Sequence, residues 1–323
     1  RDLHSFPTRR SSDLNDMELL QITELYNNVF EKKVKVDDLF KKYYWTNSQG
    51  SYHAILQIGG VIVGSYSVIP YSYIHFNKCV TFGLSVDTMI DPNHRGSLSL
   101  LKKISGLAYS KLADDGVPFV FGFPNEKIYL VRKKILKWQD IGGLDYYILP
   151  IRIGKFRKSY RYFNIVTKLF CKYHVGITRL LRYRKELSHP KNIVNAELSS
   201  EYYITKRYPR NAYYTLNSNN YVAAYRISIE DGAKVAFIVE IFPMSKRNLE
   251  DVVYKVYNSN SKIDAIIYIG KLNFKIRNLF KVPERFIPKQ LRMSGLILDK
   301  SIIGNEVYNI GNWQVNLGSY DVR

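Results

Sequence analysis

The fold is decided by residues 82–123, which read FGLSVDTMIDPNHRGSLSLLKKISGLAYSKLADDGVPFVFGF. The β-branched and aromatic run Phe82–Ile90 predicts a strand, and Asp91-Pro92 ends it. The turn Arg95-Gly96-Ser97 then opens an amphipathic helix, and a second buried strand, Pro118–Phe123, follows that helix. A strand that turns directly into a helix points unpaired backbone N–H groups, and the positive end of the helix dipole, beyond the strand. The segment therefore predicts a phosphate-binding turn.

This order of residues resembles the GCN5-related N-acetyltransferases (GNAT), in which a strand, a proline and Arg-Gly-x-Gly-x-Gly or Ala open a helix. Arg95 and Gly96 match that motif, whereas Leu98 and Leu100 stand where small residues are usual. The resemblance implies that the turn binds the pyrophosphate of acetyl-coenzyme A, and that the strand end hydrogen-bonds the pantetheine arm. The donor-binding residues that it implies are Met89, Ile90, Arg95, Gly96, Ser97, Leu98, Ser99 and Asn125.

Acetyl transfer needs a neutral amine, a polarised carbonyl oxygen and a proton for the leaving thiolate. In the resembling family, a backbone N–H at the strand end polarises the carbonyl, which here implies Met89 or Ile90. Asp87 is the candidate base, because a carboxylate that alternates with Ser85 and Met89 in an otherwise apolar strand requires an explanation. The alternative is that Asp87 only hydrogen-bonds a neighbouring strand or loop.

Tyr129 is the candidate acid. The tyrosine that frequently serves as general acid in the family would fall near Arg132 or Lys133, and Tyr129 lies one helical turn earlier. Asn125 matches the family's asparagine after the second strand, although an asparagine that caps the next helix is an equal alternative. Trp138 loosely matches the family's aromatic residue that follows. The histidines show no metal-binding spacing, so the sequence predicts no metal site.

The first fourteen residues look like the translation of a sequencing-library adapter, and we expect residues 1–14 to be disordered. The rest is long enough for two domains with sizeable cores. No run of 18 apolar residues occurs, and no stretch has the pattern of a signal peptide. Cys79 and Cys171 form no metal-like or redox-like spacing. We therefore expect a cytoplasmic protein.

The second half of the chain repeats the order of elements without the Arg-Gly turn. The strands Val235–Phe242 and Asp264–Gly270 flank a predicted helix, Leu249–Tyr257. Residues 311–321 resemble the tail of tandem acetyltransferase-like proteins of bacterial surface-polysaccharide synthesis. We thus expect an α+β fold with two GNAT-like domains in tandem, each a mixed central sheet flanked by helices. The expected domains are 15–150, which binds acetyl-coenzyme A and closes with a strand at 146–151, and 195–323, which lacks the donor site.

A basic linker, residues 151–194, joins the two predicted domains. The chain has a net charge of +20, and 151–186 hold eleven Lys or Arg against the single acid Glu186. Apolar residues recur there at helical spacing, which predicts an amphipathic helix. Its apolar stripe either packs between domains or lies on an anionic membrane surface, a peripheral contact with the inner face of the membrane. No base-reading motif accompanies the charge, so the sequence does not favour nucleic acid.

Two classes of function follow. The first is an N-acetyltransferase that moves acetyl from acetyl-coenzyme A to a primary amine, such as an amino sugar of a surface polysaccharide. The second is a FemAB-like aminoacyltransferase, or a non-catalytic tandem protein that docks through its basic helix. The side chain of Leu98 distinguishes them, because a leucine that fills the turn would prevent the donor from binding. The sequence leaves the acceptor and the oligomeric state open.

Overall fold

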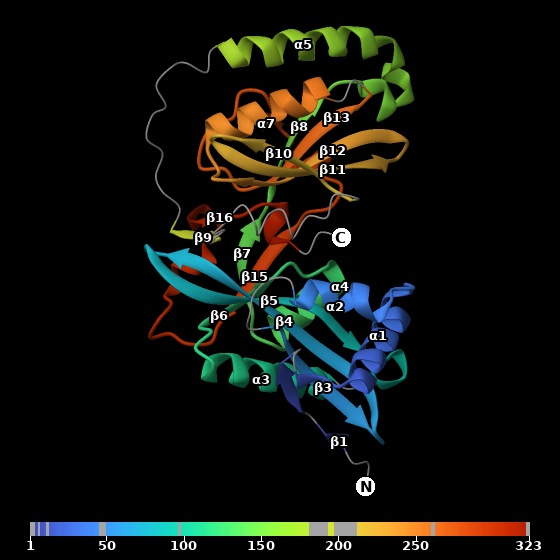
Figure 1. Cartoon of the computed structure of the whole chain (residues 1–323), viewed down its shortest axis with the longest axis vertical. Helices are drawn as coiled ribbons and strands as arrows, with labels where there is room; N and C mark the ends of the chain where they lie inside the picture. Colours follow the sequence, from blue (N-terminus) through green and yellow to red (C-terminus); the bar gives the residue numbers. More distant parts are fainter. Residues whose placement is uncertain are drawn as a thin grey trace. The chain divides into compact units, whose positions relative to one another are not determined.

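The computed structural model describes residues 4–5, 7–10, 13–44, 50–95, 98–180, 193–196, 212–259 and 262–320. Contacts divide the chain into two units (Figure 1). Unit 1 comprises 1–143, 193–197 and 291–312, and unit 2 comprises 144–192, 198–290 and 313–323. Each unit has its own mixed sheet flanked by helices, so the expected α+β class is confirmed. No described helix is both long and apolar enough to span a membrane.

Unit 1 is built on a sheet in which most neighbouring strands are antiparallel and β5 and β6 are parallel. Its main strand order is β1-β3-β4-β5-β6-β15-β7, with β2 also paired to β3 and β9 to β4. The strands are β1 (His4–Ser5), β2 (Thr8–Arg10), β3 (Tyr52–Ile58), β4 (Val61–His75), β5 (Lys78–Ile90), β6 (Phe119–Gly122), β7 (Gln139–Gly143), β9 (Val194–Ala196) and β15 (Arg292–Ile297). The helices are α1 (Asp16–Phe30), α2 (Val36–Tyr44), α3 (Leu98–Asp114) and α4 (Glu126–Lys134).

Period-2 alternation along the strands produces the core of unit 1. Tyr52, Ala54 and Leu56 of β3 pack in one cluster with the buried side of α3. The apolar spacing in Met17–Phe30 predicts a helix, which α1 confirms, and Asn15 and Glu18 form a capping box at its start. The dipeptide Gly59-Gly60 predicts a two-residue hairpin, which is also confirmed, because both glycines have positive φ between β3 and β4.

The first fourteen residues differ from our expectation of disorder. The described part of this segment forms β1 and β2, which pair antiparallel with β3, for example Thr8 with Ala54. Without them β3 would be an edge strand with a row of unpaired backbone groups, and an extended segment satisfies those groups. The segment is therefore part of the sheet.

Unit 2 is built on a sheet with the strand order β10-β11-β12-β13-β8-β14. The strands are β10 (Tyr214–Ser218), β11 (Tyr221–Glu230), β12 (Ala233–Phe242), β13 (Ala265–Gly270), β8 (Asp145–Pro150) and β14 (Phe280–Lys281), and the helices are α5 (Asn164–Leu180) and α7 (Lys246–Ser259). The strand β16 (Trp313–Gln314) also belongs to this unit. The predicted strand-helix-strand of the second half is present, with β12 and β13 parallel. The sequence also predicts a helix at 201–207, and these residues lie outside those that the structure describes.

The strand that we expected to close the first domain lies elsewhere. Strand β8 pairs antiparallel with β13 in the sheet of unit 2, where Leu149 faces Ile266. In Figure 1 this green strand stands among orange ones. The sheet of unit 1 is completed instead by β15, from the C-terminal third of the chain, which pairs with β6 and β7. The expected boundary at 150 therefore does not coincide with the boundary between the units, which contacts place after Gly143.

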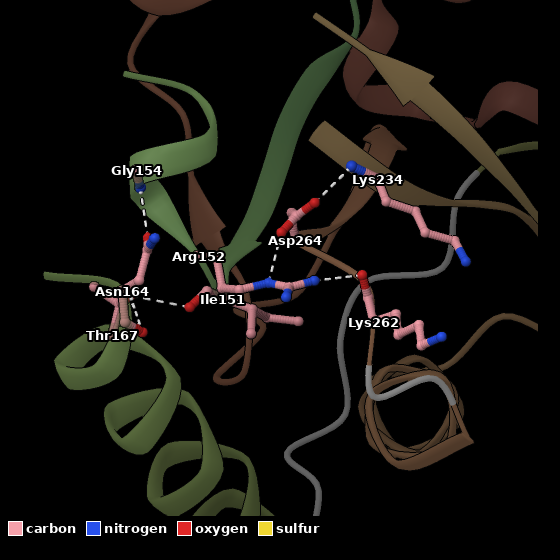
Figure 2. A network of polar contacts seen from close by, with 8 residues as sticks. All are labelled: Ile151, Arg152, Gly154, Asn164, Thr167, Lys234, Lys262 and Asp264. Atoms are coloured by element: carbon pink, nitrogen blue, oxygen red, sulfur yellow. Dashed lines mark hydrogen bonds and ion pairs between the residues drawn. The ribbon is translucent and has the colours of Figure 1, made fainter. Parts of the chain in front are cut away.

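A polar network holds the segment that follows β8 (Figure 2). Arg152 Nε forms an ion pair with Asp264 Oδ1 at 2.6 Å, and Asp264 Oδ2 accepts from the Lys234 backbone N–H at 2.7 Å. Nearer the helix, Asn164 Oδ1 accepts from Gly154 N–H, and Thr167 Oγ1 donates to the carbonyl of Ile151. The network fixes the start of α5 relative to the sheet of unit 2.

Candidate active site

The candidate site lies where β5 and β6 separate. The two strands are parallel and pair only from Phe82–Phe119 to Leu84–Phe121. Beyond that point β5 continues to Ile90 along β4, while β6 ends at Gly122. No described residue of β5 after Leu84 pairs with β6. Within the described part of the chain, one edge of β5 therefore has no strand partner over its last residues, including the Met89 and Ile90 that the sequence predicts to bind the donor.

A β-bulge lies in this part of β5. Val86 pairs with Ser67 and Met89 with Ser65, so Asp87 and Thr88 together face one residue of β4. Asp87 has φ of 43°, in the left-handed region that a residue with a side chain rarely adopts. Such strain costs about 1–3 kcal/mol and gathers at functional sites. The bulge also changes the parity of the strand, so the predicted alternation of Ser85, Asp87 and Met89 on one face is interrupted.

Arg132 of α4 lies between the two strands, and its role was missed by the sequence argument. Its Nη2 donates to Ser85 Oγ at 2.9 Å and to Thr88 Oγ1 at 3.3 Å, which shows that the bulge turns both hydroxyls toward one side. The residue is only 4% exposed. Its Nε and Nη1 are buried and have no hydrogen-bond partner among the described residues. A buried guanidinium always carries its charge, so these two donors favour a polar ligand.

Trp138 forms the other side of this arginine site. The Arg132 guanidinium lies over its ring, with Cζ 4.4 Å from the centroid. The ring is held in place because Trp138 Nε1 donates to Tyr109 Oη at 2.9 Å. Burial, followed by the neighbouring Tyr66, raises the pKa of Tyr109 well above its usual value. Tyr109 thus remains a neutral hydroxyl that positions the tryptophan beneath the cation.

Gly122 leaves room for this arrangement at the end of β6. A Cβ at this position would lie 2.7 Å from Arg132 Nη1 and 3.0 Å from the Ser85 carbonyl oxygen. A side chain there would displace the guanidinium, since both distances are shorter than ordinary contacts. The glycine, the hydroxyls and the arginine come from separate parts of the chain, so no local motif could have predicted them as a set.

Tyr129 is placed on the surface of α4, beside Asp140 and Lys133. Its hydroxyl donates to Asp140 Oδ1 at 2.6 Å, and Lys133 Nζ lies 2.5 Å from Asp140 Oδ2. Burial opposes ionisation of Asp140, but the hydrogen bonds from Lys133 and Tyr129 outweigh it and lower the pKa of this carboxyl. The Arg292 guanidinium lies over the Tyr129 ring. The Tyr129 hydroxyl proton, which an acid role would require, is therefore engaged in the hydrogen bond to Asp140 in this arrangement.

The predicted phosphate turn is described only in part. Arg95 is exposed, and its Nε donates to the Ile90 carbonyl at 3.0 Å, which ties the turn to the end of β5. The Asn93 backbone N–H donates to Asp91 and holds the pKa of that carboxyl below its usual value. Gly96, Ser97 and the side chain of Leu98 lie outside the described residues, and Ser99 is exposed in the first turn of α3. The question of whether Leu98 fills the turn therefore stays a prediction.

Asn125 serves as the N-cap of α4, where its side chain accepts from the Ile128 backbone N–H at 3.1 Å. This is the capping alternative that the sequence left open, and it orients the helix that carries Arg132. Among the described residues no group of histidine, cysteine, aspartate or glutamate is arranged to hold a metal ion. The polar groups of the site are thus Arg132, the bulge and the strand end.

Comparisons with known proteins agree with this geometry. Residues 10–133 match the family model of the acetyltransferase (GNAT) domain. No curated protein matches the sequence of this chain.

Solved structures share the fold across nearly the whole chain. A GCN5-related N-acetyltransferase from Anabaena variabilis is 10% identical with a TM-score of 0.57, over 91% of this chain and 73% of its own. A GCN5-related N-acetyltransferase from Kribbella flavida is 12% identical with a TM-score of 0.57, over 91% of this chain and 72% of its own. An Enterococcus faecalis protein described as a probable N-acyltransferase has 11% identity and a TM-score of 0.57, over 92% and 73%. Residues 10–133 are therefore similar to a GNAT acetyltransferase domain, and the solved structures show that the chain shares the fold of such proteins.

Proposed function

We propose that this chain transfers the acetyl group of acetyl-coenzyme A to a primary amine by direct attack. The observation that carries the proposal is the separation of β5 from β6 beside a strained bulge and a buried arginine with two unpartnered donors. A strand edge without a partner can hydrogen-bond an extended pantetheine arm in the manner of a further strand. Arg95 and the turn beyond Ile90 would bind the pyrophosphate.

In this proposal Arg132 binds an oxygen of the donor between the two strands. Its Nε and Nη1 point into a setting from which water is excluded, where a charge-assisted hydrogen bond is strong. A backbone N–H of Met89 or Ile90 polarises the thioester carbonyl. The amine nitrogen then bonds to the carbonyl carbon, and the tetrahedral intermediate collapses with loss of the C–S bond, so the products are an amide and coenzyme A.

Three proton transfers accompany this step, because the ammonium nitrogen loses two protons, the second of them to solvent after the new C–N bond has formed, and the departing thiolate gains one. Asp87 takes one from the attacking ammonium group, directly or through water, so that the nitrogen lone pair becomes available. Tyr129 supplies one to the departing thiolate, which requires its hydroxyl to leave Asp140 when the donor binds. Asp87 is half-buried at the bulge. Its positive φ sets the direction of the β5 backbone next to the proposed reaction centre.

The acceptor that we propose is an amino sugar used in the synthesis of a surface polysaccharide. The support is the resemblance of residues 311–321 to the tail of tandem proteins of that type, together with a strongly basic chain that raises the local concentration of anionic, nucleotide-linked sugars. Unit 2 is then a second acetyltransferase-like copy. Its strand β12 leads to α7 through Pro243-Met244-Ser245 with no Arg-Gly turn, so it would contribute no donor site.

Calorimetric titration with acetyl-coenzyme A tests the donor site. Arg95→Glu should weaken binding at least tenfold, because it places a carboxylate where the diphosphate binds. Lys300→Glu is the matched control, since it makes the same change of charge at an exposed position of unit 1 outside the proposed site. Binding that survives Arg95→Glu, or that falls equally in both variants, would place the ligand elsewhere.

A further inference from the structure

Helix α5 of unit 2 has an apolar face that points away from the body of its own unit. Its buried residues, Cys171, Val175 and Thr178, recur at helical spacing and share one side. Cys171 and Val175 pack in the same core cluster as the valines of α7. Figure 1 shows α5 and α7 on the same side of the sheet of unit 2.

The opposite side of α5 is also apolar. At about 100° per residue this second side covers an arc of about 140° centred opposite the buried one. Its large side chains are between 51% and 75% exposed, and they are Ile165, Val166, Leu169, Phe170, Tyr173, Ile177 and Leu180. The turn before the helix adds Tyr162, which is 91% exposed, and Phe163, which is 54% exposed. The described residues therefore leave a continuous apolar surface, here called the α5 outer face, of the kind that marks an interaction site.

The flank of this face is basic. Lys168, Lys172 and Arg179 lie along one border between the outer and the buried sides, and all three are exposed. The helix contains no acidic residue. Arg157 and Arg161 are exposed in the turn that precedes it. A water-soluble partner of ordinary charge gains nothing from such a one-signed border, whereas an anionic surface does.

The helix is also held rigidly enough to present this face. Asn164 and Thr167 at its start bond to Gly154 and Ile151, and Arg152 pairs with the buried Asp264 (Figure 2). Cys171 and Val175 then fix its rotation about its own axis. The outer face does not belong to the core of unit 2, because the opposite, buried side of α5 already packs against that core.

We propose that the α5 outer face binds the surface of an anionic lipid bilayer. The helix lies in the plane of the interface, with its aliphatic and aromatic side chains among the acyl chains and its lysines and arginine at the headgroups. Phenylalanine and tyrosine suit this boundary because their rings are apolar, and tyrosine also has a polar hydroxyl that can face the headgroups. The proposal does not depend on the acetyltransferase activity.

The test is co-sedimentation of the full chain with phosphatidylcholine vesicles that contain or lack phosphatidylserine. The parent should bind the anionic vesicles and not the neutral ones, and added salt should release it. Leu169→Gln with Tyr173→Gln should reduce binding more than tenfold, because two apolar side chains leave the interface. Lys168→Gln with Lys172→Gln should reduce it about 25-fold, since each cation near the surface contributes about fivefold.

Ile229→Gln is the matched control, because Ile229 is 76% exposed in β11 of the same unit and lies outside the outer face. Far-ultraviolet circular dichroism verifies that each variant is folded. If the variant with both apolar substitutions does not fold, the variant with both lysine substitutions decides the test. Equal binding to both kinds of vesicle, no binding, or equal loss in Ile229→Gln would overturn the proposal. So would sedimentation velocity that finds a dimer in the parent and a monomer in Leu169→Gln with Tyr173→Gln, because a second copy would then cover the face.

Discussion

Replacing Arg132 with methionine should separate ligand binding from stability in unit 1. Methionine keeps a flexible stem of comparable length and removes the charge. The change loses the hydrogen bonds to Ser85 and Thr88 and the contact with Trp138. The first bond is worth about 1.5–3 kcal/mol, the longer second bond less, and the contact with the ring about 2 kcal/mol, together about 4–6 kcal/mol.

The same change removes two buried donors without partners, Nε and Nη1. Each such group destabilises the folded state by about 1–3 kcal/mol, so about 2–6 kcal/mol is recovered. The net change in unfolding free energy then lies between a gain of about 2 kcal/mol and a loss of about 4 kcal/mol, centred on a loss of about 1 kcal/mol, which lowers Tm by about 2–4 °C for a unit of this size. The affinity for acetyl-coenzyme A should nevertheless fall about 10–100-fold, since a charge-assisted hydrogen bond to the donor is lost.

Arg152→Met provides the opposite case in unit 2. It leaves the Asp264 carboxylate, whose side chain is 4% exposed, without its cation, and breaking such a pair destabilises by about 3–5 kcal/mol. We expect this variant to melt earlier and to bind acetyl-coenzyme A like the parent, measured by thermal unfolding and calorimetry. An Arg132→Met variant that retains the affinity of the parent, or that loses as much stability as Arg152→Met, would contradict this role of Arg132.

Three further predictions concern other residues. Gly122→Ala should lower the unfolding free energy by about 1–3 kcal/mol through overpacking, whereas Gly106→Ala in α3, whose Cβ meets nothing within 4 Å, should not; thermal melts decide between these outcomes. Burial raises the pKa of the Cys171 thiol to about 11 from 9.0 and so disfavours its thiolate. An aromatic disulfide reagent at mildly alkaline pH should therefore modify the exposed Cys79 and should modify Cys171 only after denaturation. Equal rates of modification at the two cysteines would contradict this prediction. Asp87→Asn should reduce turnover on a panel of primary amines that includes amino sugars while acetyl-coenzyme A affinity stays within about twofold, and unchanged turnover would remove Asp87 from the mechanism.

Much of unit 1 could be predicted because its signals are local. The strand Phe82–Ile90, the helix after Gly96 and the hairpin at Gly59-Gly60 each follow from the period of apolar residues or from a turn residue. The same holds for the amphipathic helix within 151–186. These patterns also carried the resemblance to the acetyltransferases, which the family match and the fold support.

The choice of strand partners could not be read in this way. Residues 145–150 and 292–297 both have the composition of buried strands, but nothing within them says which sheet they join. Their partners are distant in sequence, β13 for the former and β6 with β7 for the latter. The expectation that 146–151 closes the first domain used sequence adjacency, which tertiary packing overrode.

By itself, then, the sequence determined the order of helices and strands, the turn after β5 and the basic, apolar character of α5. These features follow from the spacing and charge of neighbouring residues, which do not depend on the tertiary fold. Only the tertiary structure decided that β5 contains a bulge at Asp87, that Arg132 enters the separation between β5 and β6, and that the core of unit 2 takes up only one of the two apolar sides of α5. These features depend on which segments meet, and a contact between distant residues is the result of the whole chain burying its apolar surface at once.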